Sequence, residues 1–96
     1  MPLRTASRVD GNQPAVVSAL RAIGCSVLYT HQLKNCFDIL VGYRGRTFLM
    51  EIKDPAQPLS KRQLTPGEEE FRCTWRGSPY HVVLTPDDAI RIVTTP

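Results

Sequence analysis

The stretch FDILVGYRGRTFLMEIK, residues 37–53, constrains the fold of this chain more than any other feature. Two apolar runs flank a short Arg-Gly turn, which is typical of a β-hairpin. We therefore expect strands over residues 37–42 and 47–53, joined by a turn at Tyr43–Arg46. A charged residue is out of place in such apolar segments, because burying a charge is costly unless it is paired.

The hydrophobic pattern also fixes the pairing of these two strands. When the hairpin is centred on Arg44-Gly45, paired residue numbers sum to 89 and each apolar residue meets an apolar partner. This register sets Asp38 opposite Glu51, and Lys53 points to the same face as Glu51 because side chains alternate along a strand. Opposed like charges destabilise a sheet. Either a divalent cation with oxygen ligands lies between the acids, or Asp38 pairs with a nearby base in a solvated cluster.

Periodicity and capping residues predict three helices and two further strands. Thr65, Pro66 and Glu68 form a capping-box pattern at the start of the second helix, which we expect to end at Gly77. The predicted helices lie in residues 12–24, 64–77 and 85–93, and the additional strands in residues 25–33 and 80–84. This order predicts an α/β fold with one mixed sheet and helices on its faces.

Length and composition are those of an ordinary single domain. A chain of 96 residues can bury one core, so we expect a flexible N-terminal arm over residues 1–11 and one domain over residues 12–96. Its apolar runs are too short for a membrane span, and its start does not look like a secretory signal. We expect a cytoplasmic protein with neither a membrane partner nor an organic cofactor.

A basic surplus suggests an acidic partner. The formal net charge is +3, and most of the basic residues are arginines, which suit two-pronged contacts with phosphate. Arg72 and Arg76 are four residues apart and are expected to share a helix face. The residues that could contact the backbone phosphates of a nucleic acid, without base specificity, are Arg44, Arg46, Lys61, Arg62, Arg72 and Arg76.

Asp38 in FD and the tripeptide EIK at residues 51–53, both on one hairpin, resemble the sequence motif of the PD-(D/E)XK nuclease superfamily. The core of that superfamily has the element order αβββαβ. The segments LVGYRGRTFLMEIKD and QLTPGEEEFRCTWRG are most similar to the small stand-alone VRR-NUC domains of phages and bacteria, and the likeness spans roughly residues 12–84. It implies a restriction-endonuclease-like core, with a four-stranded mixed sheet flanked by helices and a short C-terminal helix.

The resemblance also implies an activity. The chain would be a Mg²⁺- or Mn²⁺-dependent endonuclease that hydrolyses DNA phosphodiester bonds, selective for junctions, flaps or nicks, in phage or bacterial replication or repair. Asp38, Glu51 and the main-chain carbonyl of Ile52 would hold the metal ion. Lys53 would orient or help to deprotonate the attacking water, or lie against the developing negative charge. The protein would work in the cytoplasm of a bacterium or a phage-infected host.

The sequence departs from the family pattern in several places. Phe37 replaces the proline before the aspartate, and only Asn12 is available where some members carry an acid on the first helix. Either Glu68 or Gln63 occupies the position of the family's helix glutamine. These departures leave open a catalytically inactive module that binds nucleic acid or recruits a partner. The sequence likewise does not decide whether the chain forms a homodimer.

Overall fold

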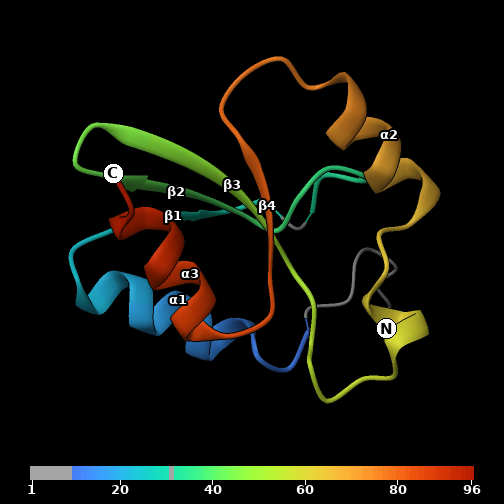
Figure 1. The fold of residues 1–96 in the computed structure, drawn as a ribbon, viewed down its shortest axis with the longest axis horizontal. Coiled ribbons are helices and arrows are strands. Elements are labelled where there is room, and N and C mark those ends of the chain that lie inside the picture. The colour runs from blue at the N-terminus through green and yellow to red at the C-terminus, as the bar shows by residue number, and fades with distance from the viewer. Residues whose placement is uncertain (1–9, 31) are drawn as a thin grey trace.

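A computed structural model describes residues 10–30 and 32–96 as one mixed sheet with three α-helices (Figure 1). The α/β fold with a four-stranded mixed sheet is confirmed. The predicted arm falls mostly on residues 1–9, which lie outside the described residues. The elements are α1 (Gln13–Ala22), β1 (Ser26–Tyr29), β2 (Ile39–Tyr43), β3 (Arg46–Ile52), the 3₁₀ helix η1 (Leu59–Arg62), α2 (Pro66–Thr74), β4 (Tyr80–Val83) and α3 (Pro86–Thr94).

The strands follow one another across the sheet in the order β1-β2-β3-β4. The first three are antiparallel neighbours, and β4 runs parallel to β3. Ile39 pairs with Met50 and Tyr43 with Arg46, so the predicted register with a sum of 89 is confirmed. Only Arg44 and Gly45 form the turn, with φ angles of 50° and 80°. Two positive φ angles are what a tight two-residue hairpin requires, so each strand reaches one residue closer to the turn than predicted. At their other ends the strands are shorter than predicted, because β2 begins at Ile39 and β3 ends at Ile52.

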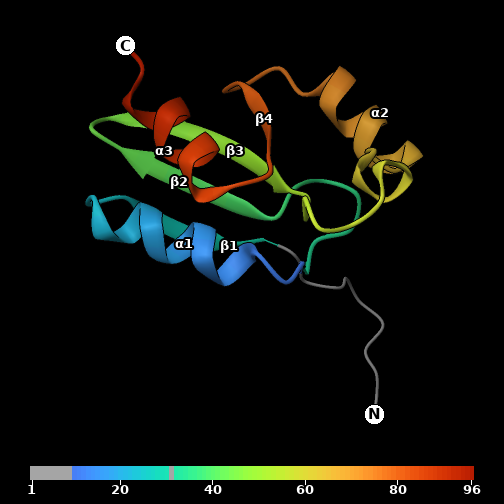
Figure 2. The ribbon, with the colours of Figure 1, turned by 60° about the horizontal axis from the view of Figure 1, so that its bottom comes forward.

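One face of the sheet carries the hydrophobic core. The helices α1 and α3 lie side by side on this face (Figures 1 and 2). Their apolar stripes meet the inward-facing residues of all four strands, and the burial of this apolar surface is the main stabilising contribution to the fold. The buried cluster comprises Val16, Val17, Leu20, Cys25, Val27, Ile39, Val41, Phe48, Met50, Ile52, Val83, Ala89 and Val93.

The opposite face of the sheet is only partly covered. Leu28, Leu40 and Leu49 pair across β1, β2 and β3, yet Leu28 is 62% exposed while Leu49 is buried. Glu51 lies two residues beyond Leu49 and therefore points to this same face. It is buried although it faces away from the core, so the region beside it must be covered by something other than α1 and α3.

The helix α2 supplies part of that cover. It lies apart from α1 and α3 in both views (Figures 1 and 2). Its predicted capping box is present: the Thr65 hydroxyl accepts from Glu68 N, and the Glu68 carboxylate accepts from Thr65 N. The ring of Phe71 contacts the rings of Phe37 and Tyr80, with centroids 5.7 and 6.0 Å away. These contacts hold α2 over the end of the sheet where Glu51 lies.

The end of α2 differs from the prediction. The helix stops at Thr74 rather than at Gly77, so the expectation that Arg72 and Arg76 share a helix face is wrong. Trp75 has an extended backbone with ψ of 131°, and its indole N–H donates to Ser78 O at 2.9 Å. The indole ring fills the space beside Gly77, where an added Cβ would lie 2.8 Å from the ring. A side-chain contact thus ends the helix before the glycine is reached.

We expect the substitution Gly67→Ala to destabilise the fold by about 1–2 kcal/mol, because overpacking outweighs the helix propensity gained. A Cβ on Gly67 would lie 2.4 Å from Asn35 Oδ1, so the first turn of α2 is in close contact with the loop before Asp38. Gly42→Ala is the control, because its Cβ would meet Ser26 at an ordinary 3.8 Å. Urea unfolding measures both; a Gly67→Ala protein as stable as the parent would contradict this packing.

Candidate active site

Asp38 lies immediately before β2 with its carboxylate held against β3. Its backbone N–H donates to Met50 O at 3.0 Å, and its Oδ2 accepts from Ile52 N at 2.7 Å. Thr30 N donates to Asp38 O at 2.8 Å, which ties the same residue to β1. The regular pairing of β2 with β3 ends at Ile39 and Met50, so the predicted direct pairing of Asp38 with Glu51 is not part of the ladder. The Asp38 carboxylate instead accepts from the Ile52 N–H. Asp38 is thereby fixed beside Glu51.

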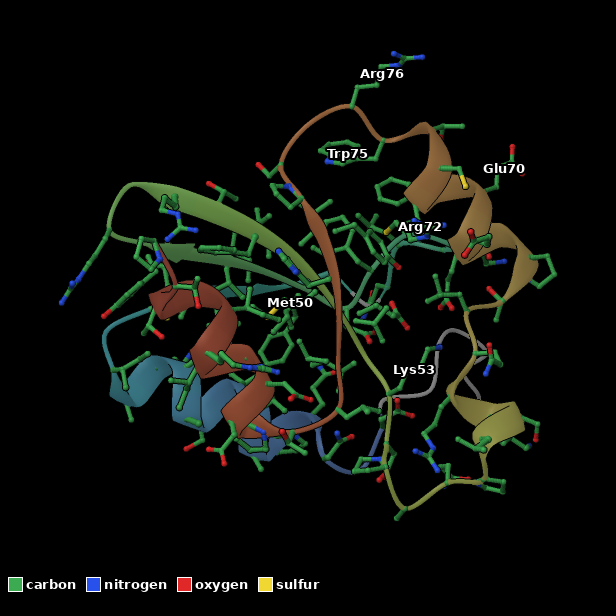
Figure 3. The ribbon with its side chains drawn as sticks, viewed as in Figure 1. Met50, Lys53, Glu70, Arg72, Trp75 and Arg76 are labelled. Carbon is green, nitrogen blue, oxygen red and sulfur yellow. The ribbon has the colours of Figure 1, made fainter. Side chains whose placement is uncertain are left out.

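Lys53 lies between two acids. Its ammonium is 3.2 Å from Glu51 Oε2 and 3.1 Å from Glu68 Oε1. Glu51 and Lys53 are only 4% and 8% exposed, which is rare for charged residues and requires partners of this kind. The capping box of α2 orients the Glu68 carboxylate, and Lys53 reaches from the end of β3 towards it (Figure 3).

These contacts shift the protonation of the whole group. Burial, followed by the charge of Asp38, raises the pKa of Glu51 to about 9. Burial also raises the pKa of Asp38 to about 6, although the Ile52 N–H opposes this shift. Burial disfavours the ammonium of Lys53, but Glu51 and Glu68 outweigh that effect and raise its pKa. The site therefore has more carboxylates than one lysine neutralises, and the raised pKa of Glu51 favours its protonated form at neutral pH.

An additional acid, missed by the sequence analysis, lies near the start of α1. The charge of Asp10 contributes to the raised pKa of Asp38, so these two carboxylates are close. The chain turns from Asp10 into α1 through a hydrogen bond from Gln13 N to Asp10 O. An acid two residues before the N-cap was the available signal, but the analysis assigned it to the N-terminal arm.

Asn12 has a structural position beside the site. It is the N-cap residue of α1 but makes no side-chain cap; its amide instead donates to Lys53 O at 3.1 Å and Leu84 O at 2.8 Å. It thereby joins the start of α1 to the ends of β3 and β4. Its Oδ1 is buried and has no hydrogen-bond partner among the described residues. An unpaired buried oxygen of this kind is suited to a donor group or a bound water.

The two alternatives for the second-helix residue are placed differently. Glu68 contacts Lys53, whereas the amide of exposed Gln63 turns back to Leu59 O at 3.4 Å. Gln63 follows η1 rather than lying on α2. Within the contacts described, Glu68 therefore belongs to the site.

The six basic residues expected to bind DNA do not form one surface. Arg44 and Arg46 lie at the hairpin, at the other end of the molecule from η1 and α2 (Figures 1 and 2). Lys61 and Arg62 are on η1, and Arg62 donates to Gln57 O at 2.9 Å. Arg72 on α2 pairs with Glu69. Arg76 points outwards from the loop after α2 (Figure 3). Of these six residues, Lys61 on η1, Arg72 on α2 and Arg76 after α2 are therefore on the same side of the molecule as Lys53.

The donor set suits a hard divalent cation. The carboxylates of half-buried Asp38 and buried Glu51 are suitable oxygen ligands, and the Ile52 carbonyl is the next main-chain acceptor along β3. Mg²⁺ needs only one or two protein carboxylates because it keeps several waters. In the part of the chain that is described, no group of three or more His, Cys, Asp or Glu residues is arranged to hold a metal ion. Any ion here would depend on main-chain and water oxygens for its remaining ligands.

Comparison with protein-family models, curated proteins and solved structures found no match for this chain. The resemblance to the PD-(D/E)XK nucleases therefore rests on the residues quoted above. Over the described residues, no helix is both long and apolar enough to cross a membrane.

Proposed function

We propose that this protein is a metal-dependent phosphodiesterase that cleaves DNA. The observation that carries the proposal is the pair of mutually repelling carboxylates, half-buried Asp38 and buried Glu51, with Lys53 at 3.2 Å from the second. A fold has no need of such an arrangement, because a hydrophobic residue at position 51 would remove the repulsion. A site that binds a cation and then acts on a phosphate does need it.

In this proposal each side chain has a defined task. Asp38 and Glu51, with the Ile52 carbonyl, would hold Mg²⁺ or Mn²⁺, which would lower the pKa of a bound water and polarise the phosphate. Asp38 is held for this by the Ile52 N–H. Lys53 keeps its proton because its pKa is raised, so it acts as a fixed positive charge beside the developing negative charge rather than as a base. Glu68 positions the Lys53 ammonium from α2.

The same proposal extends to the fold family and to the substrate. The sheet, α1 and α2 would form the αβββαβ core of a restriction-endonuclease-like fold, with α3 as the additional helix. The substrate would be branched or nicked DNA of a bacterium or its phage, held through backbone phosphates by the basic residues near Lys53. The supporting features are the register of the hairpin and the capping box that brings Glu68 to Lys53.

The test is incubation of the purified protein with linear, nicked, flap and four-way-junction DNA in Mg²⁺, in Mn²⁺ and in EDTA. Cleavage should require the divalent ion and should be lost with Lys53→Met. Salt-sensitive DNA binding without cleavage in any ion would point to the inactive binding module instead. Absence of both binding and cleavage would exclude either role.

We expect Glu68→Gln to lower the cleavage rate about tenfold to hundredfold while leaving the fold intact, because residues that orient a catalytic group typically matter to this extent. Glutamine keeps an oxygen for Thr65 N but loses the charge that fixes Lys53. Single-turnover cleavage and urea unfolding give the two quantities. Gln63→Ala is the comparison, and it should cleave like the parent; the reverse order of effects would assign the site to Gln63.

A further inference from the structure

A hollow lies away from the candidate active site. Its volume is about 640 Å³, and it is lined by residues of β3, β4 and α3, among them Arg46, His81 and Arg91. Arg46 precedes Glu51 by five residues on β3, which is about 16 Å along a strand. None of Asp38, Glu51, Lys53 and Glu68 lines it. This hollow is therefore a separate feature of the molecule.

The charged groups around the hollow are basic. Arg46 stacks over the ring of Phe48 at 4.9 Å and donates one N–H to Thr95 O at 2.7 Å. A guanidinium carries five N–H donors, so this contact leaves others to meet a ligand. Arg91 pairs through one nitrogen with Asp88 at 2.9 Å and remains largely exposed. No aspartate or glutamate is among the residues that line the hollow.

Part of the remaining wall is apolar, and Thr47, Thr95 and Pro96 complete the lining. The ring of Phe48, the ring of Pro79 and the side chain of Ile92 supply the apolar part. His81 lies 6.1 Å from Phe48 between ring centroids, and burial lowers its pKa. A neutral imidazole offers one donor and one acceptor. Two guanidiniums can bind a dianionic group, while the apolar walls and the imidazole can contact a flat heterocycle attached to it. The volume of the hollow is within the range of small-ligand pockets.

We propose that this hollow binds a nucleoside monophosphate, with the phosphate at Arg46 and Arg91 and the base between His81 and the apolar walls. The same chemistry is presented by a free mononucleotide and by the phosphorylated end of a DNA strand. The site does not depend on the candidate active site, and it binds without a divalent ion.

The experiment is a titration followed by amide NMR on the full chain in EDTA, so that no DNA is cleaved. The probes are thymidine 5′-monophosphate, thymidine, inorganic phosphate, and a tetranucleotide with and without a 5′-phosphate. The monophosphate should shift the amides of Phe48, His81 and Ile92 saturably and bind at least tenfold more tightly than thymidine or phosphate alone. Binding of the phosphorylated tetranucleotide at the same amides would identify a strand end as the ligand, whereas exclusion of it would identify the free nucleotide.

Matched variants decide whether the hollow is responsible. Arg46→Gln and Arg91→Gln should each weaken monophosphate binding at least tenfold. Arg21→Gln should not, because that guanidinium lies over Tyr29 at 5.6 Å, donates to Val27 O and is not among the lining residues. The parent spectrum confirms that each variant is folded. The proposal is overturned if no saturable shift occurs at millimolar ligand, or if all three arginine variants bind alike. Because no metal ion or cleavage is involved, a failed cleavage assay does not affect this result.

Discussion

Replacing Glu51 with glutamine is expected to reduce Mg²⁺-dependent DNA cleavage by about 10³-fold, since the variant removes one of two metal-binding carboxylates and the developing charge loses its stabilisation. Glutamine has nearly the same shape as glutamate, so the pairing of β3 with β2 and β4 should persist. The measurement is the single-turnover cleavage rate at saturating enzyme, together with Mn²⁺ affinity by calorimetry. Both quantities should fall, because the same carboxylate serves both.

A matched variant separates this effect from a general loss of acidic charge. Glu70→Gln removes a carboxylate from α2 that points away from the site (Figure 3), and it should cleave at the parental rate. A Glu51→Gln protein that cleaves as fast as the parent would remove the basis of the nuclease proposal. A loss of cleavage with unchanged Mn²⁺ affinity would instead place the ion elsewhere.

The hairpin was predictable because several local rules agree there. The pairing of apolar residues fixed the register, and Arg44-Gly45 can adopt the two positive φ angles that a tight turn needs. The capping box of α2 was predictable for the same reason, since Thr65 and Glu68 satisfy each other's backbone groups within one turn. The register placed Asp38 just beyond the last pair, Ile39 and Met50, whereas its contact with β3 is a side-chain hydrogen bond from Ile52 N. Local sequence patterns thus predicted most of the sheet and the residues at the centre of the candidate site.

What depended on tertiary contacts was not predictable. The end of α2 is set by the packing of Trp75 against Gly77, and no helix-stop signal in the sequence distinguishes Thr74 from its neighbours. The charge of Asp10 raises the pKa of Asp38 although the two residues are 28 positions apart, and no local pattern links them. The hollow beside Arg46 likewise combines side chains from β3, β4 and α3 that are far apart in sequence. Such contacts become visible only once the elements are assembled.

The metal-free protein is expected to lose stability as the pH rises from 5 to 8. Burial raises the pKa of Glu51 to about 9 from an ordinary 4.5, so the folded state holds a proton that the unfolded state has released over this range. Stability then falls with pH, and the loss is fully developed only above the folded pKa. Asp38, with a pKa of about 6, adds to the slope only in its lower part. At about 1.4 kcal/mol per pH unit for one proton, we expect a total decrease on the order of 5 kcal/mol, most of it from Glu51.

Urea unfolding at pH 5, 6, 7 and 8 in EDTA measures this slope, and Glu51→Gln isolates its cause. The variant should be the more stable protein at pH 8 and should lose most of the slope above pH 6, because the buried group can no longer ionise. Glu70→Gln should keep the parental slope. Mn²⁺ should stabilise the parent more at pH 8 than at pH 5, because an ion binds ionised carboxylates and competes with the protons they hold. Equal pH slopes for the parent and Glu51→Gln would show that Glu51 is ionised in the metal-free fold. Lys53 would then already balance the repulsion between the Asp38 and Glu51 carboxylates.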